Sequence, residues 1–191
     1  MTKSAEQSKE KPKTRAERAA HWWRRLNGFD EEGQRDPKLP RHPGALAALR
    51  RASRPSEAAA VPETFLLYRQ LGFSHLGDRA LECVAVLAHV LAHVRASADT
   101  KLGKALGSGD QPVLKEIRLR RLVAARDAEE TMRGFREAVA LLDGYANVED
   151  LTGCILAWLD PDEARSDRAR TRFLFEWHGA GAAAPPDHSG V

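Results

Sequence analysis

Long hydrophobic runs and cysteines are both scarce in this chain of 191 residues. No apolar run approaches the roughly 20 residues that a membrane-spanning helix needs, and the first residues, MTKSAEQSKEKPKT, lack the apolar core of a signal peptide. The two cysteines, Cys83 and Cys154, stand in apolar helical contexts without metal-ligand spacing. We therefore expect a cytoplasmic globular protein with buried, reduced thiols, no cofactor and no contact with membranes.

The chain also lacks a marked excess of charge of either sign. It has 30 basic and 27 acidic residues, a formal net charge of +3, and residues 1–13 hold four lysines and two glutamates. The remaining body is nearly neutral, and such a body cannot attract nucleic acid through its average field. Any binding of nucleic acid must therefore come from local clusters of basic residues.

Alternation of polar and apolar residues with period two, the pattern of a half-buried strand, does not occur over any useful length. Apolar residues recur instead at helical spacing between capping residues, which predicts an all-α protein with early helices over about 14–28, 62–72 and 78–94. The first opens with a capping box of Thr14 and Glu17. The third is apolar nearly all round, which predicts a buried central helix.

The second half of the chain predicts four helices joined by short loops. The segment 112–125 is followed by helices that open at Asp127, Asn147 and Asp160, and the last runs to about His178. Short connections imply antiparallel neighbours, so we predict an antiparallel four-helix bundle.

These patterns predict an organisation in four parts. Residues 14–100 form an N-terminal helical part and residues 101–179 form the C-terminal four-helix bundle. We expect the lysine-rich residues 1–13 and the tail 180–191 to be disordered. Residues 102–112, LGKALGSGDQP, read as a flexible loop.

Nothing in the sequence predicts a catalytic site, and we expect a protein that is not an enzyme. His89 and His93 are four residues apart, a spacing that can hold zinc, but neither a glutamate beside His89 nor a third ligand accompanies them. We interpret them as two imidazoles at the margin of the buried helix. The glycine-containing stretch 102–112 lacks the Gly-Lys-Ser/Thr ending of a phosphate-binding loop.

Two clusters of basic residues contain few acids. Residues 41–54 hold four arginines and no acid, and residues 101–126 hold seven basic residues against Asp110 and Glu116. Guanidinium groups suit phosphate because their planar fork donates two parallel hydrogen bonds. Such residues can also solvate the outer faces of amphipathic helices, and both interpretations stay open. The four arginines within 165–172 are weaker evidence because acids flank them.

Aromatic residues make up 6% of the chain and do not look like platforms for stacking bases. Six of them share helical stripes with aliphatic residues, which places them in the predicted core: Trp22, Phe65, Phe135, Trp158, Phe173 and Trp177. Contacts to the phosphate backbone are therefore the expected mode of any nucleic-acid binding.

A series of short motifs runs through residues 20–178. They are Trp22-Trp23-x-x-Leu26, Ala-Leu-Arg50-Arg51-Ala-Ser53, Pro62-x-x-Phe65-x-x-Tyr68, Leu102-Gly103-Lys104-Ala105-Leu106, Glu116-x-Arg118-Leu119-x-x-Leu122-Val123, and the stretch from Arg168 to Phe173 before Trp177. In this order and spacing the chain resembles the small subunit, called CasB, of the type I-E CRISPR surveillance complex Cascade.

The resemblance implies an all-helical, non-catalytic subunit of a ribonucleoprotein in antiviral defence. It implies as partners the other Cascade subunits, a second copy of the chain, the guide RNA, and the target and displaced DNA strands. Its task would be to stabilise the guide RNA–target DNA heteroduplex and the displaced strand, together called the R-loop. Guide pairing reads the sequence, while protein subunits supply charge and shape.

By matching motif, the resemblance also names candidate nucleic-acid-binding residues. They are Arg50, Arg51, Lys104, Arg118 and Arg121, with Arg168 and Arg172 as fainter candidates.

Two other functions stay open. A free-standing helical DNA-binding transcription regulator would need a recognition helix with exposed polar residues behind a short turn, and we find no convincing one. An enzyme that uses His89 and His93 would have to bind a metal ion.

Overall fold

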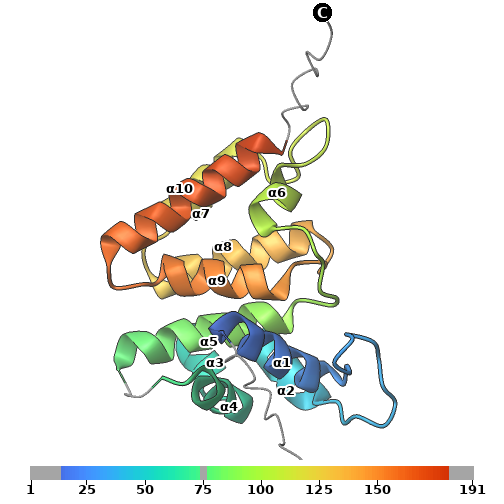
Figure 1. Cartoon of the computed structure of the whole chain (residues 1–191). Coiled ribbons are helices and arrows are strands. Elements are labelled where there is room, and N and C mark those ends of the chain that lie inside the picture. The colour runs from blue at the N-terminus through green and yellow to red at the C-terminus, as the bar shows by residue number, and fades with distance from the viewer. Residues whose placement is uncertain (1–13, 74–76, 181–191) are drawn as a thin grey trace, which may run out of the picture.

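A computed structural model of the chain describes residues 14–73 and 77–180. Within these ranges the chain forms ten helices and no strand, which confirms the predicted all-α class (Figure 1). The tails predicted as disordered lie outside the described residues, except for Ala180. No helix in the described ranges combines the length and the hydropathy that crossing a membrane requires.

The first half of the chain wraps a central helix, α5 (Asp78–Ala92), with four others: α1 (Arg15–Asn27), α2 (Pro43–Arg51), α3 (Pro55–Ala59) and α4 (Pro62–Leu71). The predicted capping box is present, since Glu17 N donates to Thr14 Oγ1 over 3.2 Å and Thr14 N donates to Glu17 Oε2 over 2.7 Å. α5 packs against α2, α3, α4, α8 and α9. Because α5 is covered on most sides, its apolar residues occur nearly all round the helix.

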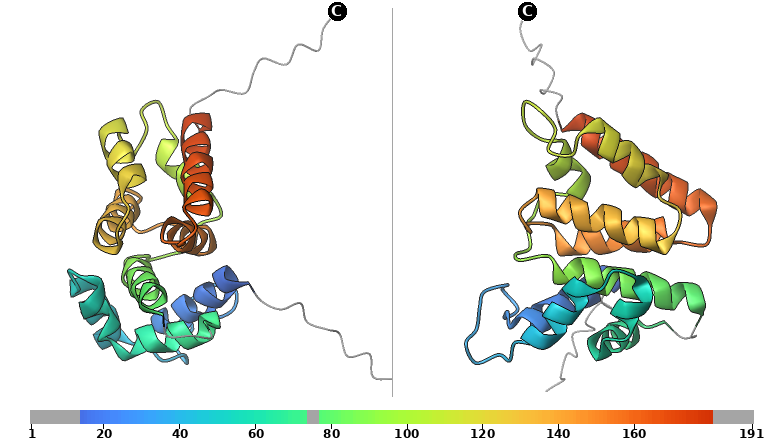
Figure 2. Two further views of the ribbon diagram at one scale, coloured as in Figure 1. Left: turned by 90° about the vertical axis from the view of Figure 1, so that its left-hand side faces the viewer. Right: turned by 180° about the vertical axis from the view of Figure 1, so that it is seen from behind.

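The second half stacks on α5 in two further layers. It consists of α6 (Leu102–Gly107), α7 (Glu116–Ala124), α8 (Ala128–Leu141), α9 (Val148–Trp158) and α10 (Glu163–Gly179). α8 and α9 rest on α5, and α7 and α10 cross them at the far side, with α6 against α10 (Figures 1 and 2). The antiparallel four-helix bundle is not confirmed in this crossed arrangement, and the division of the chain at residue 100 stays a prediction.

Two local expectations need correction. The stretch expected to be a flexible loop contains α6, whose first backbone N–H, at Leu102, donates to Asp150 Oδ2 over 2.8 Å. α10 begins later than Asp160, because the carboxylate of Asp162 accepts the amide N–H groups of the first turn and makes Asp162 the N-cap.

One continuous core of buried side chains joins the two halves. Five of the six aromatic residues expected in the core are buried there, and Trp158 packs edge-on against Phe135 and Phe173. The sixth expectation was wrong, since Phe65 is 54% exposed. α4 turns Thr64, Leu67, Tyr68 and Leu71 inward, which leaves Phe65 on its outer face.

Candidate nucleic-acid interface

Arg50 and Arg51 end α2, and the structure gives them different surroundings. The Nε of Arg50 donates to the carbonyl oxygen of Ala92, the last residue of α5, over 2.6 Å. Desolvation lowers the pKa of Arg50, and the charges of Arg41 and Arg95 lower it further. Arg51 is exposed and makes no hydrogen bond or ion pair with any described residue.

The repulsion on Arg50 shows that Arg41 and Arg50, at the two ends of α2, lie close to Arg95, which is more than 40 residues further along the sequence. Arg41 precedes α2, Arg50 ends it, and Arg95 follows α5. No carboxylate contributes to the shift in the pKa of Arg50. The three guanidinium groups therefore form a local concentration of positive charge that the net charge of the chain does not reveal.

His93 links this cluster to α8. Burial, and after it the positive charge of His89, Arg50 and Arg136, lowers its pKa to about 4. Arg136, on α8, therefore lies near the same end of α5 as Arg50. At neutral pH the imidazole of His93 carries no charge, so the local charge comes from the arginines alone.

Further along the same face, a hollow of about 170 Å³ opens between α7 and α8. Arg118 and Arg121 of α7 and Arg133 of α8 line it, together with Glu130 and Glu137. Arg133 lies one helical turn before Arg136 and so joins the hollow to the cluster at α5. The right panel of Figure 2 shows α2, α8 and α7 on the same side of the molecule.

We call this set the arginine surface. Its seven members are all exposed, and none forms an ion pair with a described carboxylate: Arg41, Arg50, Arg95, Arg118, Arg121, Arg133 and Arg136. It brings together three residues expected from the sequence, Arg50, Arg118 and Arg121. It adds Arg41, which belongs to the basic cluster 41–54, and Arg95, Arg133 and Arg136, which no basic cluster in the sequence contained.

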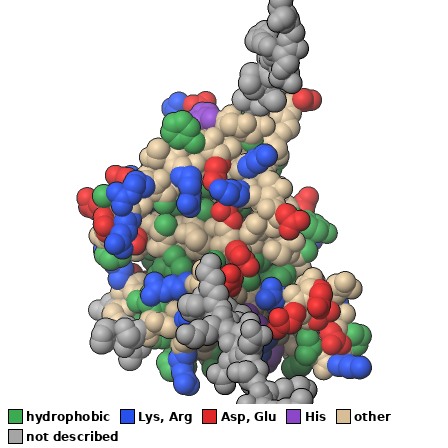
Figure 3. Space-filling model, viewed as in Figure 1, with side chains coloured by type: hydrophobic (Ala, Val, Ile, Leu, Met, Phe, Trp, Pro, Cys, Tyr) green, Lys and Arg blue, Asp and Glu red, His purple; other side chains and the backbone are tan. Residues whose placement is uncertain are grey.

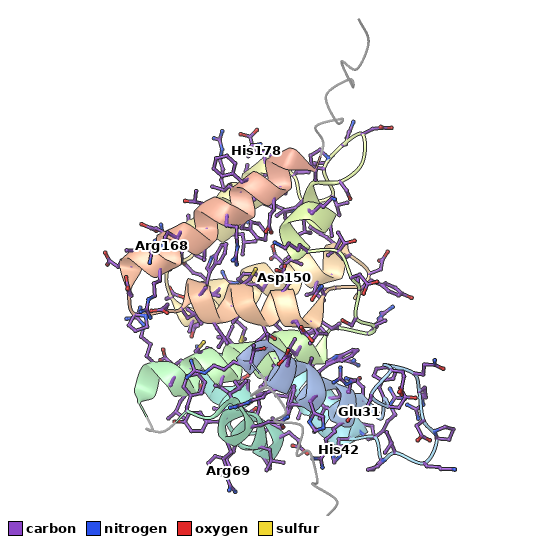
Figure 4. The ribbon with its side chains drawn as sticks, viewed as in Figure 1. Glu31, His42, Arg69, Asp150, Arg168 and His178 are labelled. Atoms are coloured by element: carbon purple, nitrogen blue, oxygen red, sulfur yellow. The ribbon has the colours of Figure 1, made fainter. Side chains whose placement is uncertain are left out.

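The remaining candidates lie on α6 and α10. Figure 4 places Arg168 on α10, on the side facing the viewer, and Figure 3 shows basic and acidic side chains mixed over this region. Arg172 lies 4.0 Å from Glu176, which also pairs with Lys101 over 2.9 Å. Lys104 and Arg168 are exposed without a partner among the described residues. α10 lies on the opposite side of the molecule from the arginine surface (Figure 2).

A further arginine, Arg170, is structural. It is 4% exposed, and its guanidinium donates to the carbonyl oxygens of Val123, Ala125 and Trp158. These carbonyls lie at or just beyond the carboxyl ends of α7 and α9, where the helix dipoles favour a cation. Arg170 therefore ties three helices together and is unavailable to a ligand.

Of the two histidines that could suggest a metal site, His89 lies in the interior and His93 is partly buried at the end of α5. His89 is fully buried, and its Nδ1 donates to the carbonyl oxygen of Leu49 over 2.7 Å. This bond leaves Nε2 as the unprotonated nitrogen, and that atom is buried without a partner. No group of three or more potential metal ligands occurs in the part of the chain that the structure describes.

The family model for the CRISPR-associated protein Cse2 matches residues 45–178. The chain belongs to the Cse2 family. The motifs of the sequence had indicated this family under its other name, CasB, and that prediction is confirmed. The matched residues run from α2 to α10 and include all seven candidate binding residues.

A solved structure has the same fold as this chain. The chain matches a protein in the crystal structure of E. coli Cascade bound to a PAM-containing dsDNA target, with a TM-score of 0.60 and 20% sequence identity. The match covers 85% of this chain and 95% of the E. coli chain. No curated protein matches the chain.

Proposed function

We propose that this chain is a non-catalytic structural subunit of a type I-E Cascade complex that binds the phosphate backbone of nucleic acid. Its proposed partners are the other Cascade subunits, a second copy of the chain, the guide RNA, and the target and displaced DNA strands. Membership of the Cse2 family and the fold shared with a protein of the E. coli Cascade–DNA complex support the proposal.

The observation that carries the binding role is the arginine surface. Arginines from five separate helices or loops converge there without ion-pair partners. Bringing them together costs repulsion, which adds to desolvation in lowering the pKa of Arg50. A phosphate backbone would relieve this repulsion, and each guanidinium can donate two parallel hydrogen bonds to it. Backbone contacts of this kind hold a strand without reading its sequence.

We assign the seven candidates unequal roles. Arg50, Arg118 and Arg121 belong to the arginine surface, and Arg51 adjoins it at the end of α2. Lys104, Arg168 and Arg172 would serve a second strand or another partner on the α6–α10 side. In the complex, the proposed contribution is to slow the collapse of the R-loop while guide pairing supplies the target specificity.

A salt titration with the full chain tests the phosphate contacts. In single-stranded DNA the slope of log affinity against log salt is about −0.7 for each phosphate neutralised. Replacing both Arg118 and Arg121 by Ala should therefore flatten the slope by roughly 1.4, by the same amount for two unrelated DNA sequences.

The control is a pair of exposed arginines of equal charge, Arg25 on α1 and Arg69 on α4, which line a separate hollow. Replacing this pair by Ala should change the slope much less. Equal effects from both pairs would show that only diffuse charge acts. An altered sequence preference in the Arg118/Arg121 variant would contradict backbone binding and favour a transcription regulator.

A further inference from the structure

Tyr145 is an exposed aromatic residue on a firmly held turn. Its side chain is 59% exposed, in the connection between α8 and α9. The turn is closed by hydrogen bonds from Gly144 N to the oxygen of Val139, 3.0 Å, and from Tyr145 N to the oxygen of Leu142, 2.9 Å. Gly144 adopts a φ of 83°, a left-handed conformation that glycine adopts without strain.

The segment that follows α5 holds the turn from its other side. Arg95 N donates to the oxygen of Gly144 over 2.8 Å, and Ala146 N donates to the oxygen of Ala96 over 3.3 Å. Ala146 itself is 2% exposed. The backbone of Tyr145 is thus fixed on both flanks while the ring stays in solvent, so placing a ligand on the ring would cost little ordering entropy.

The same contacts bring Tyr145 to the edge of the arginine surface. The side chain of Arg95 lies over the turn, since a Cβ added to Gly144 would come within 2.8 Å of Arg95 Cγ. The charge of Arg95 acts in turn on Arg50, as does that of Arg41. Asp143 contributes one carboxylate to the turn, against the three positive charges of Arg41, Arg50 and Arg95, so the charge at this place stays positive.

We propose that Tyr145 is a stacking platform for an unpaired base of a strand whose phosphates bind Arg95 and Arg50. The inference rests on the proposed function and adds that this end of the arginine surface binds single strands. An aromatic face stacks on any base, which suits a subunit that does not read sequence. A base inside a duplex is already stacked and cannot reach the ring. The sequence had predicted contacts to the backbone alone.

The test compares two fluorescently labelled probes of equal length and charge, a single-stranded DNA and an abasic strand that keeps every phosphate. The full chain should bind the strand with bases at least about fivefold more tightly, the lower end of the effect of one base stacked on an aromatic ring. Tyr145→Ala should abolish this difference and leave binding of the abasic strand unchanged. Tyr145→Phe should preserve it, because the ring is retained.

Two further variants separate this inference from the proposed function. Replacing Arg118 and Arg121 by Ala should weaken binding of both probes equally. If this variant bound both probes as tightly as the unchanged protein, the phosphate contacts would be rejected and the stacking would not. Phe175→Ala removes an exposed aromatic ring from α10, 75% exposed, and should keep the preference for bases. A preference that survives Tyr145→Ala, or that is lost with Phe175→Ala instead, would overturn the assignment to Tyr145.

Discussion

At the scale of single residues, Arg50 combines a structural role with the proposed binding role. Its Nε donates to the oxygen of Ala92 at the carboxyl end of α5, where the helix has unpaired carbonyls. His89 makes the reciprocal link, from α5 to the oxygen of Leu49. The ends of α2 and α5 are therefore joined by two bonds, and Arg50 can offer its remaining N–H groups to a ligand.

This double role predicts unequal stability effects for two adjacent arginines. Arg50→Ala should lower the free energy of unfolding by about 1–3 kcal/mol, because it removes a charge-assisted hydrogen bond to a helix end. Arg51→Ala, which removes an equal charge from an exposed side chain without partners, should change it by less than about 0.5 kcal/mol. Urea denaturation measures both, and equal effects would show that the bond to Ala92 does not stabilise the fold.

His93 predicts a loss of stability in acid. Its pKa in the folded chain is about 4, below its ordinary value of 6.5, because burial and neighbouring positive charge disfavour the imidazolium. The unfolded chain therefore binds the proton first as the pH falls from 6.5 to 4. The free energy of unfolding should fall across that window, by up to about 3 kcal/mol from this residue.

The contribution of His93 is isolated by comparison with a variant. In His93→Gln the free energy of unfolding should decline less steeply between pH 6.5 and pH 4. Urea denaturation at each pH measures this free energy for both proteins. Identical pH profiles for the two proteins would mean that His93 is protonated equally easily in the folded and unfolded chains.

The sequence predicted some of these residues and could not predict others. Arg50, Arg118 and Arg121 stand in basic stretches that are visible in the sequence. Arg95 is isolated, and Arg133 and Arg136 alternate with glutamates on α8, so their local charge balance gave no signal. They join the arginine surface only because α7, α8 and the end of α5 pack side by side.

At the scale of elements, helices were predictable where their signals are local. The caps Thr14, Asp127 and Asn147 each accept the expected backbone N–H, and Gly28 and Gly72 end their helices in the left-handed conformation. α6 was missed because its glycines suggested a loop. Glycine is needed at these positions because α10, more than 60 residues further along the sequence, lies directly against them and leaves no space for a Cβ.

Gly107 tests this account of α6. A Cβ added there would lie 2.1 Å from the carbonyl oxygen of Trp177, so the two helices can approach this closely only with glycine at that position. Gly107→Ala should force α6 away from α10 and lower the free energy of unfolding by about 1–3 kcal/mol, the usual cost of overpacking.

The matched control is a glycine within a helix that has space around it. A Cβ on Gly153 of α9 would meet nothing within 4 Å, so Gly153→Ala should raise the free energy of unfolding by about 0.5–1 kcal/mol through its better helix propensity. Thermal or urea unfolding distinguishes the two. A stabilising Gly107→Ala would contradict the close packing of α6 on α10.

At the scale of the whole molecule, a nearly neutral chain places its positive charge unevenly. The arginine surface gathers guanidinium groups without ion-pair partners along α2, α8 and α7, whereas Arg165 and Arg172 of α10 form ion pairs with carboxylates. This asymmetry fits a subunit that lies between a nucleic-acid strand on one side and a protein partner on another. The sequence predicted the family and the helical class. It could not predict which basic residues share one face of the molecule, because that depends on how the helices pack.

The most direct measurement is the lifetime of the R-loop on Cascade assembled from its other subunits and guide RNA, with and without this chain. We predict that the chain joins the complex and slows dissociation of the target DNA, and that the variant with Ala at positions 118 and 121 joins equally well but slows dissociation less. A chain that fails to join, or R-loop lifetimes that are the same with and without it, would contradict the account.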